Sequence, residues 1–393
     1  MTTQVVVVGS GYAGAGAVKA FEDEVGEGEA ELTWISEHDY HLVLHEVHRA
    51  IRNPAVEDNI TIPVGEIMSE DGEFVQGRVV DVDTEDQVVE TDDGEAVEYD
   101  YLLLAIGSTT AFFGIDGLKE HAHQLKSLAD AQAIHDDVRE AAGNATRSEP
   151  AQVLVGGAGL SGIQTAGEIA EYRDKHRAPL DITLVEGLDE VFPGNDPQLQ
   201  GALRQRLEDA DVEILTGDFI SKADEDAVYL GGGEDEEPEE LAYDVLIWTG
   251  GITGQKELDA VDVEKDDRSN RVFAESDFTT SDDRVFAIGD TALVDQGGDD
   301  VAPPTAQAAW QAAEVAGDNL ARAARGAPLH SWQHEDKGTV ISVGEEAVAH
   351  DVVGMPIKTF GGTPAKLLKK AIASRWIAKV SSTGRGIGAF GDM

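Results

Sequence analysis

Two glycine-rich turns in this sequence have the spacing that binds the pyrophosphate of a dinucleotide, and they start 148 residues apart. Their glycines are Gly9, Gly11 and Gly14 in the first turn, and Gly157, Gly159 and Gly162 in the second. The first glycine of such a turn permits the tight bend, the second admits the phosphates, and the third lets helix pack on strand. One such spacing is a weak signal, but its recurrence indicates a duplicated nucleotide-binding unit.

An acidic residue follows each turn at nearly the same distance. Glu37 lies 23 residues beyond Gly14, and Glu186 lies 24 residues beyond Gly162. A carboxylate at this place accepts hydrogen bonds from the adenosine ribose, and it repels a 2′-phosphate. The sequence therefore predicts two bound dinucleotides, with NAD favoured over NADP at the second site.

Each turn needs a buried strand before it and a helix after it, and a second strand must carry the acid. The apolar runs that meet these needs are residues 5–8 and 151–155 before the turns, 15–21 and 163–172 after them, and 32–36 and 181–185 before the acids. Strands that alternate with helices in this way predict an α/β chain with two Rossmann-like dinucleotide-binding domains.

Three further strands end at small or acidic residues. Residues 101–106 stop at Gly107, residues 243–249 stop at Gly250, and residues 285–289 are followed by Asp290. A small residue at a strand end lets a cofactor lie against the backbone. The Asp290 carboxylate can bond the hydroxyls of a ribityl chain, although a Gly-Asp pair is also common in ordinary turns.

An alanine-rich stretch, residues 306–325, predicts a helix with Thr305 as its N-cap and Gly326 at its end. A helix that points its N-terminus at a flavin stabilises the anion formed on reduction. An ordinary core helix explains the alanines, but it does not explain Gln307 and Gln311 at positions i and i+4.

Four histidines, His38, His41, His45 and His48, are spaced so that a helix would place them on one face. A metal cluster is conceivable there. We favour polar and aromatic lining of a cofactor crevice, and we predict no metal site.

Composition limits the function classes. The chain has 393 residues, a net charge of −48 and no cysteine. Its length suits two or three domains. The charge excludes a nucleic-acid binder and suggests an organism with a salt-rich cytoplasm, and the absence of cysteine excludes thiol and disulfide chemistry. No secretory signal and no apolar run long enough to span a membrane is recognisable, so we expect a cytoplasmic protein. We expect the acidic run 231–240 to form a solvated loop or hairpin.

The end of the chain reverses this charge. Residues 352–393 contain seven Lys or Arg and one acid. Residues 364–380 predict a helix with Leu367, Leu368, Ala371 and Ile372 on one side and Lys366, Lys369 and Lys370 on the other. We favour a helix that lies on a membrane surface over a docking helix or a dimer contact.

Together these stretches resemble the type II NADH dehydrogenases, the single-chain NADH:quinone oxidoreductases among the flavoproteins with two dinucleotide-binding domains. The similar segments are DYHLVLHEV (39–47), LAIGS (104–108), IWTGG (247–251), AIGD (287–290) and KGTVISVG (337–344). The most specific is Ala306-Gln307-x-Ala309-x-Gln311, which matches the quinone-site pattern AQxAxQ. The sequence departs from the family at Gln164, where an acid is usual, and in a shorter segment between His41 and His45.

The resemblance implies FAD at the first glycine turn and NADH at the second, with hydride passing from NADH to flavin and two electrons passing on to a quinone. The implied FAD contacts are Gly9, Gly11, Gly14, Glu37, Gly107, Asp290 and Ala306. The implied NAD contacts are Gly157, Gly159, Gly162, Glu186 and Gly250. The implied catalytic residues are Gln307 and Gln311 near the quinone, with Glu168 as a weaker candidate on the nicotinamide side.

The resemblance also implies an organisation for the chain. Residues 1–118 and 255–330 would form the FAD domain, residues 119–254 an inserted NAD domain, and residues 331–393 a C-terminal segment with a basic amphipathic helix. The protein would be a homodimer bound peripherally to the cytoplasmic face of the membrane. Two rival hypotheses are a soluble NADH reductase for a small iron–sulfur protein and a redox-inert FAD protein that senses NADH.

Overall fold

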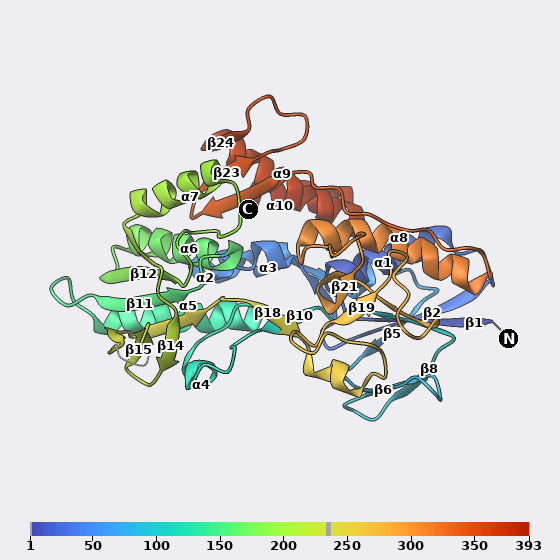
Figure 1. Ribbon diagram of the computed structural model, residues 1–393. Helices are drawn as coiled ribbons and strands as arrows, with labels where there is room; N and C mark the ends of the chain where they lie inside the picture. The colour runs from blue at the N-terminus through green and yellow to red at the C-terminus, as the bar shows by residue number, and fades with distance from the viewer. Residues whose placement is uncertain (1, 233–236, 393) are drawn as a thin grey trace.

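The computed structural model describes residues 2–232 and 237–392, and it shows two lobes with the C-terminal segment lying across them (Figure 1). Part of the acidic run 231–240, for which we expected a loop or hairpin, lies outside the described residues. Each lobe is built on a parallel sheet, with strand order β20-β9-β1-β2-β5 in the first and β13-β12-β11-β17 in the second.

The first lobe is organised around the valine strand. Its sheet contains β1 (Thr3–Val8), β2 (Ala30–Ser36), β5 (Glu73–Gln76), β9 (Tyr101–Leu104) and β20 (Val285–Ala287). The four valines of β1 are buried because a parallel sheet is covered on both faces. Helix α1 (Tyr12–Glu24) packs closely on α8 (Ala306–Ala324): a Cβ on Gly317 would lie only 2.5 Å from the Ala17 carbonyl oxygen. Small residues on both helices permit this approach.

The second lobe repeats the plan. Its sheet contains β11 (Ala151–Gly156), β12 (Leu180–Glu186), β13 (Val212–Thr216) and β17 (Val245–Trp248). Its helices are α5 (Leu128–Asn144), α6 (Leu160–His176) and α7 (Pro197–Asp209). The two lobes are joined by two chain segments, and these pair as the antiparallel strands β10 (Ser108–Thr110) and β18 (Ile252–Gly254). We call the segments that contain these strands the connectors.

The histidine-containing segment does not form the helix that would place all four rings on one face. It passes through β3 (Tyr40–Leu42), a 3₁₀ turn at Leu44–Glu46 and α2 (Arg49–Arg52). Strand β3 pairs with β4 (Thr61–Pro63), so hydrogen bonding to a neighbouring strand overrides the helical spacing. His41, His45 and His48 consequently have different surroundings.

The C-terminal segment contains β22 (Thr339–Val343), β23 (Glu346–His350), β24 (Thr359–Gly361), α9 (Thr363–Val380) and α10 (Thr383–Asp392). The predicted helix at 364–380 is confirmed as α9, but the predicted faces are partly wrong. Lys369 is 3% exposed and lies on the buried face with Trp376, whereas Leu367 and Ile372 are exposed. The Trp376 indole N–H donates to His41 Nε2 at 2.8 Å, so α9 is anchored in the first lobe. Over residues 2–232 and 237–392, no helix combines the length and apolar character needed to span a membrane.

Candidate functional site

The two glycine turns have the same backbone geometry. Gly9 and Gly157 have φ of +104° and +91°, in the region that favours glycine. A Cβ on Gly14 would lie 1.9 Å from the Gly9 carbonyl oxygen, and a Cβ on Gly162 would lie 1.8 Å from the Gly157 carbonyl oxygen. These four glycines are therefore required by the tight packing of turn, strand and helix.

The middle glycine of each turn differs from its neighbours because it faces open space. A Cβ on Gly11 or Gly159 would meet no described atom within 4 Å. Both residues are the N-caps of their helices, α1 and α6, and neither helix start has a side-chain cap among the described residues. Open space in front of uncapped N–H groups fits a phosphate at each helix N-terminus.

The two acids lie at the carboxyl ends of their strands, but they differ in contacts. Glu186 accepts hydrogen bonds from the Ala158 N–H at 2.8 Å and the Leu188 N–H at 3.0 Å, so its carboxylate is held against the second glycine turn. The Glu37 side chain is exposed at the end of β2.

The fold brings the strand-end residues together. The Gly107 N–H donates to Thr291 Oγ1 at 2.8 Å, and the Ser108 hydroxyl donates to Asp290 Oδ2 at 3.0 Å. Gly107 and Asp290, which are 183 residues apart in the sequence, therefore lie side by side. We call the surface formed by Gly107, Ser108 and Asp290 the wall. Gly250 lies against the second turn, because a Cβ on Gly157 would be 2.6 Å from its Cα.

The N-terminus of α8 is built as the sequence predicts. Thr305 is confirmed as the N-cap, since its hydroxyl accepts from the Ala308 N–H at 3.1 Å, and Ala306 is the first helical residue. This cap orients α8 so that its first turn, with Gln307, meets the C-terminal segment.

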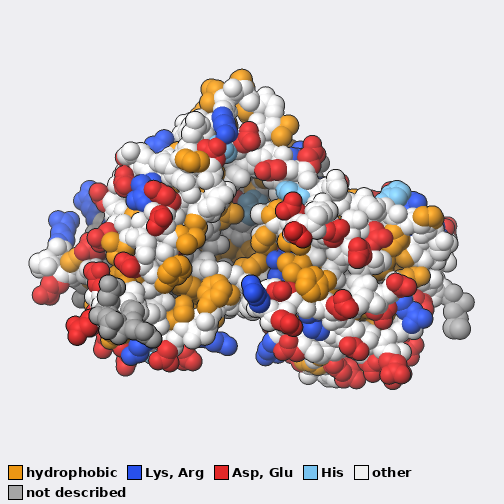
Figure 2. Space-filling model, viewed as in Figure 1, with side chains coloured by type: hydrophobic (Ala, Val, Ile, Leu, Met, Phe, Trp, Pro, Cys, Tyr) orange, Lys and Arg blue, Asp and Glu red, His pale blue; other side chains and the backbone are white. Residues whose placement is uncertain are grey.

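Gln307 and Gln311 turn their amide groups toward residues 335–338. Gln307 accepts from the Lys337 N–H at 2.7 Å and donates to the Gly338 carbonyl at 3.2 Å. Gln311 exchanges two hydrogen bonds with the backbone of Glu335, at 2.8 and 3.0 Å. The pair thus fixes the segment that leads into β22. A hollow lies between the lobes on the face shown in Figure 2, with apolar side chains around it.

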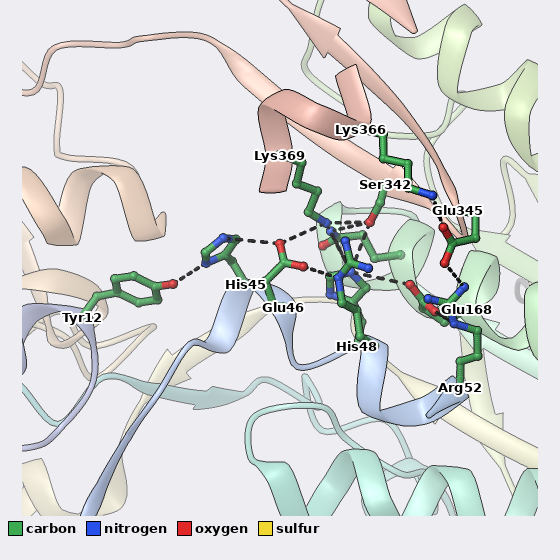
Figure 3. Close-up of polar contacts among 12 residues, drawn as sticks. Tyr12, His45, Glu46, His48, Arg52, Glu168, Ser342, Glu345, Lys366 and Lys369 are labelled. Atoms are coloured by element: carbon green, nitrogen blue, oxygen red, sulfur yellow. Dashed lines mark hydrogen bonds and ion pairs between the residues drawn. The ribbon is translucent and has the colours of Figure 1, made fainter. Parts of the chain in front are cut away.

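A buried cluster of charged and polar side chains joins the first lobe, α6, β22 and α9 (Figure 3). At its centre the Ser342 hydroxyl lies 2.6 Å from Lys369 Nζ, 3.1 Å from His48 Nε2 and 3.3 Å from Gln164 Nε2. His48 Nε2 is 3.2 Å from Lys369 Nζ. We call this group and the residues bonded to it the buried polar cluster.

One arm of the buried polar cluster runs to the first glycine turn. Lys369 Nζ is 3.6 Å from Glu46 Oε1, which is 3.4 Å from His45 Nε2. His45 Nδ1 is hydrogen-bonded to the hydroxyl of Tyr12, the residue that follows Gly11. A continuous row of titratable groups therefore leads from Lys369 to the first turn of α1.

The other arm runs to the surface. His48 Nε2 lies 4.0 Å from Glu168 Oε1, and Arg52 Nε approaches Glu168 Oε2 to 2.9 Å. Arg52 also pairs with Glu345 at 2.5 Å, and Glu345 pairs with Lys366. Glu168 is fully buried, whereas the Glu345 side chain is 42% exposed.

Burial and neighbouring charge move the pKa values in this cluster in opposite directions. Burial raises the pKa of Glu168 to about 7, against the attraction of Arg52 and Arg49. Burial alone would also raise the pKa of Glu46, but Lys369, Arg49 and His45 lower it to about 2. Burial lowers the pKa of Lys369 to about 8, and Glu46 opposes that change. Of these three groups, Glu168 and Lys369 thus have pKa values near neutrality.

Comparison with known proteins agrees with this geometry. Residues 3–313 match the family described as pyridine nucleotide-disulphide oxidoreductase. The chain belongs to this family.

Among individual relatives, the type II NADH:quinone oxidoreductase of Staphylococcus aureus is 29% identical over 397 residues, covering 97% of this chain and 96% of that protein. The structure is similar to NDH2 from Plasmodium falciparum, with a TM-score of 0.83 at 16% identity over 99% and 98% of the two chains. It is also similar to the sulfide:quinone oxidoreductase of Aquifex aeolicus, with a TM-score of 0.79 at 18% identity over 98% and 93% of the chains.

Membership of the pyridine nucleotide-disulphide oxidoreductase family does not bring disulfide chemistry to this protein. The chain has no cysteine. The features of this chain that can bind ligands are the two glycine turns and the hollow between the lobes.

The buried charge of Glu168 gives a pH-dependent prediction. Its pKa is about 7 in the folded protein against 4.5 ordinarily, so the protonated side chain favours the folded state. Its contribution to the free energy of unfolding is therefore complete below about pH 4.5 and is lost as the pH rises through 7. We expect the stability of Glu168→Gln relative to wild type to rise by up to about 3 kcal/mol across this window. Denaturant unfolding at several pH values measures the difference, with Glu171→Gln as the control on the same helix. Parallel curves for Glu168→Gln and wild type would refute it.

Sequence reasoning placed Glu168 in the site but missed most of the buried polar cluster. Glu46, His48 and Lys369 come from segments more than 300 residues apart. The available signal was the lysine at 369, which interrupts the apolar spacing of α9 at a position that faces inward. Treating the four histidines as one helical face also hid a difference among them: His41 and His48 are buried, His45 is partly buried and His38 is exposed.

Proposed function

We propose that this protein is an FAD-dependent NADH:quinone oxidoreductase of the type II class. The observation that carries this proposal is the pair of equivalent glycine turns, each with open space at its middle glycine and an uncapped helix start behind it. The name of the S. aureus relative, which aligns with nearly the whole chain, supports the same activity.

The residues fit FAD at the first turn and NADH at the second. Gly9, Gly11 and Gly14 would hold the FAD pyrophosphate, Glu37 its ribose, and Gly107, Asp290 and Ala306 the wall beside its ribityl chain and ring. The second turn, with Gly157, Gly159, Gly162, Glu186 and Gly250, would hold NADH. A bound flavin accepts a hydride and returns electrons to a quinone. The chain contributes orientation, since the hollow between the lobes is where both ligands can meet.

Reduction of a quinone also consumes two protons. The buried polar cluster supports proton supply, because titratable groups connect Glu345 at the surface with Glu168, His48, Lys369 and Glu46 (Figure 3). Arg52 pairs with both Glu168 and Glu345 and orients the two carboxylates. In this proposal Gln307 and Gln311 position residues 335–338 beside the quinone, and the quinone enters from the side of α9.

The exposed apolar side chains support attachment to a membrane surface. Seven of the thirteen large hydrophobic residues that are exposed in the described chain belong to the C-terminal segment: Val353, Met355, Ile357, Leu367, Ile372, Ile387 and Phe390. The opposite side of α10 is tied to the first lobe, where Arg385 pairs with Glu66 at 2.7 Å. A segment anchored on one side and apolar on the other suits peripheral binding at the cytoplasmic face.

A homodimer also remains part of the proposal.

Membrane attachment can be tested by replacing two of these side chains. We expect Leu367→Ser/Ile372→Ser to reduce binding to lipid vesicles by about tenfold, because each loses apolar area that would insert in lipid. Sedimentation with vesicles measures the bound fraction, and Leu188→Ser, which is 50% exposed on the second lobe, is the control. Deleting the whole segment would be a poor test, since α9 buries Trp376. Equal binding of all three proteins would argue against attachment through α9.

The preference for NADH can be tested at Glu186. We expect Glu186→Gln to lower the ratio of kcat/KM for NADH to that for NADPH by about tenfold, because the 2′-phosphate would no longer meet a carboxylate. The amide keeps an acceptor for the Ala158 N–H. Glu190→Gln, whose side chain is 53% exposed, is the control. An unchanged ratio would mean that Glu186 does not face the ribose.

One experiment tests the function as a whole. The purified protein, reconstituted with FAD, is mixed anaerobically with NADH while the flavin absorbance is followed, and a short-chain quinone is then added. We expect bleaching by NADH and recovery with quinone. Absence of bleaching would refute this function and the iron–sulfur reductase hypothesis and would favour the NADH sensor. Bleaching without recovery by quinone would favour the iron–sulfur reductase.

A further inference from the structure

A partly buried lysine, Lys126, contacts the residues proposed to lie beside the flavin. Lys126 follows β10 and immediately precedes Ser127, the N-cap of α5. Its Nζ donates to the Ser108 hydroxyl at 3.0 Å, and that hydroxyl donates to Asp290 Oδ2, also at 3.0 Å. The three residues form one polarised chain from an ammonium to a carboxylate.

The position of Lys126 is fixed by its own backbone. Its N–H donates to Asp130 Oδ2 at 2.8 Å, and Asp130 completes a capping box with Ser127 at the start of α5. The side chain therefore extends from a rigid helix start toward Ser108. Burial lowers the pKa of Lys126, while the Asp290 carboxylate opposes that change.

Ser108 is held from both connectors. Lys126 on the outgoing connector bonds its hydroxyl, and Gln255 on the returning connector donates to its carbonyl oxygen at 3.4 Å. On the other side of Asp290, Arg271 donates to the Asp290 carbonyl oxygen at 2.8 Å. Two cations, Lys126 and Arg271, thus lie on either side of Asp290, and the Asp266 carboxylate also acts on Arg271.

We propose that Lys126 is a positioning residue of the flavin site, which orients Ser108 and Asp290 for the ribityl chain and raises the reduction potential of the bound flavin. The proposal rests on the function proposed above. Two-electron reduction by NADH adds negative charge to the flavin, and a fixed cation nearby stabilises that charge. Of the three linked residues, Ser108 is buried, and Lys126 and Asp290 are partly buried. Lys126 comes from the segment that leads into the second lobe, so the placement of that lobe and the properties of the flavin are linked through one side chain.

The test compares the FAD-loaded wild type with Lys126→Met, Lys126→Arg and Ser108→Ala. Lys119→Met, at an exposed position in α4 (Leu118–His121), is the control. Spectroelectrochemical titration gives the flavin potential, and ultrafiltration gives the fraction of FAD released. We expect Lys126→Met to lower the ratio of reduced to oxidised flavin at a given potential by about tenfold, which corresponds to about 30 mV for two electrons, and to release more FAD. Lys126→Arg should restore the ratio to within about twofold.

Ser108→Ala separates the two parts of the proposal, since it breaks the hydroxyl link and keeps the cation. We expect it to release more FAD with little change in potential. An unchanged potential in Lys126→Met, with FAD bound, would overturn the proposal even if FAD release increased. If Lys126→Met fails to fold, Lys126→Gln replaces it with the same expectations. Failure of the wild type to bind FAD would instead refute the proposed function, so the two failures are distinguishable.

Discussion

Replacing Gly159 by valine is expected to abolish reduction of the bound flavin by NADH while the protein keeps its FAD. The reason is geometric: a Cβ at Gly159 meets no described atom within 4 Å, so the valine side chain would extend into the open space at the α6 N-terminus. Loss of the charged hydrogen bonds there would weaken NADH binding by roughly 100-fold, or about 2.7 kcal/mol. Stability should change by no more than about 1 kcal/mol, because the residue is a partly exposed N-cap with φ −75°, which any residue can adopt.

The equivalent change in the first lobe should have the opposite pattern. Gly11→Val is expected to remove FAD while leaving the NADH site intact, since its surroundings are equally open. NADH titration calorimetry and flavin absorbance together assign each ligand to its turn, and Gly201→Val, at another open position on α7, is the control. If Gly159→Val lost FAD and Gly11→Val lost NADH, the assignment of the two ligands to the two lobes would be reversed.

Replacing Lys369 by methionine is expected to destabilise the protein by about 2–3 kcal/mol, because the change removes one of the two cations that compensate the buried Glu46 carboxylate, while Arg49 stays paired with it. Glu46 is 1% exposed and Lys369 Nζ lies 3.6 Å from it. The neighbouring Lys366→Met should cost less than about 1 kcal/mol, since its partner Glu345 is 42% exposed and also pairs with Arg52.

Denaturant unfolding of the FAD-saturated proteins measures both changes. The double variant Lys369→Met/Glu46→Gln removes the lysine and the carboxylate together, and the coupling energy of the double-mutant cycle reports the contribution of this pair, with Arg49 present in all four proteins. Equal stabilities for the Lys369 and Lys366 variants would show that Lys369 reaches water, and this would contradict its place in the buried polar cluster. Quinone reduction should also slow in Lys369→Met if the cluster supplies protons.

Much of the chemistry near the backbone could be predicted from the sequence alone. A tight turn after a buried strand requires glycine at fixed positions. The spacing of Gly9, Gly14, Gly157 and Gly162 therefore predicts the local backbone geometry. The N-cap at Thr305 and the helix at 363–380 follow from equally local rules. Such features depend on interactions within a few residues, and the sequence is sufficient for them.

The buried polar cluster and the contact of Lys126 with Ser108 were decided only by the tertiary structure. The helical spacing predicted Lys369 on the solvent side of α9, but the helix is rotated so that Trp376 packs in the first lobe and bonds His41. That rotation carries Lys369 inward, where Glu46 and Ser342 compensate it. Lys369 and Glu46 are more than 300 residues apart, and they meet only because of how the lobes and the C-terminal segment pack. The spacing of residues along the chain does not predict such a contact. The sequence by itself was sufficient to predict where dinucleotides would bind, because that depends on local turns, whereas the packing of the lobes and the C-terminal segment determines which charged side chains meet.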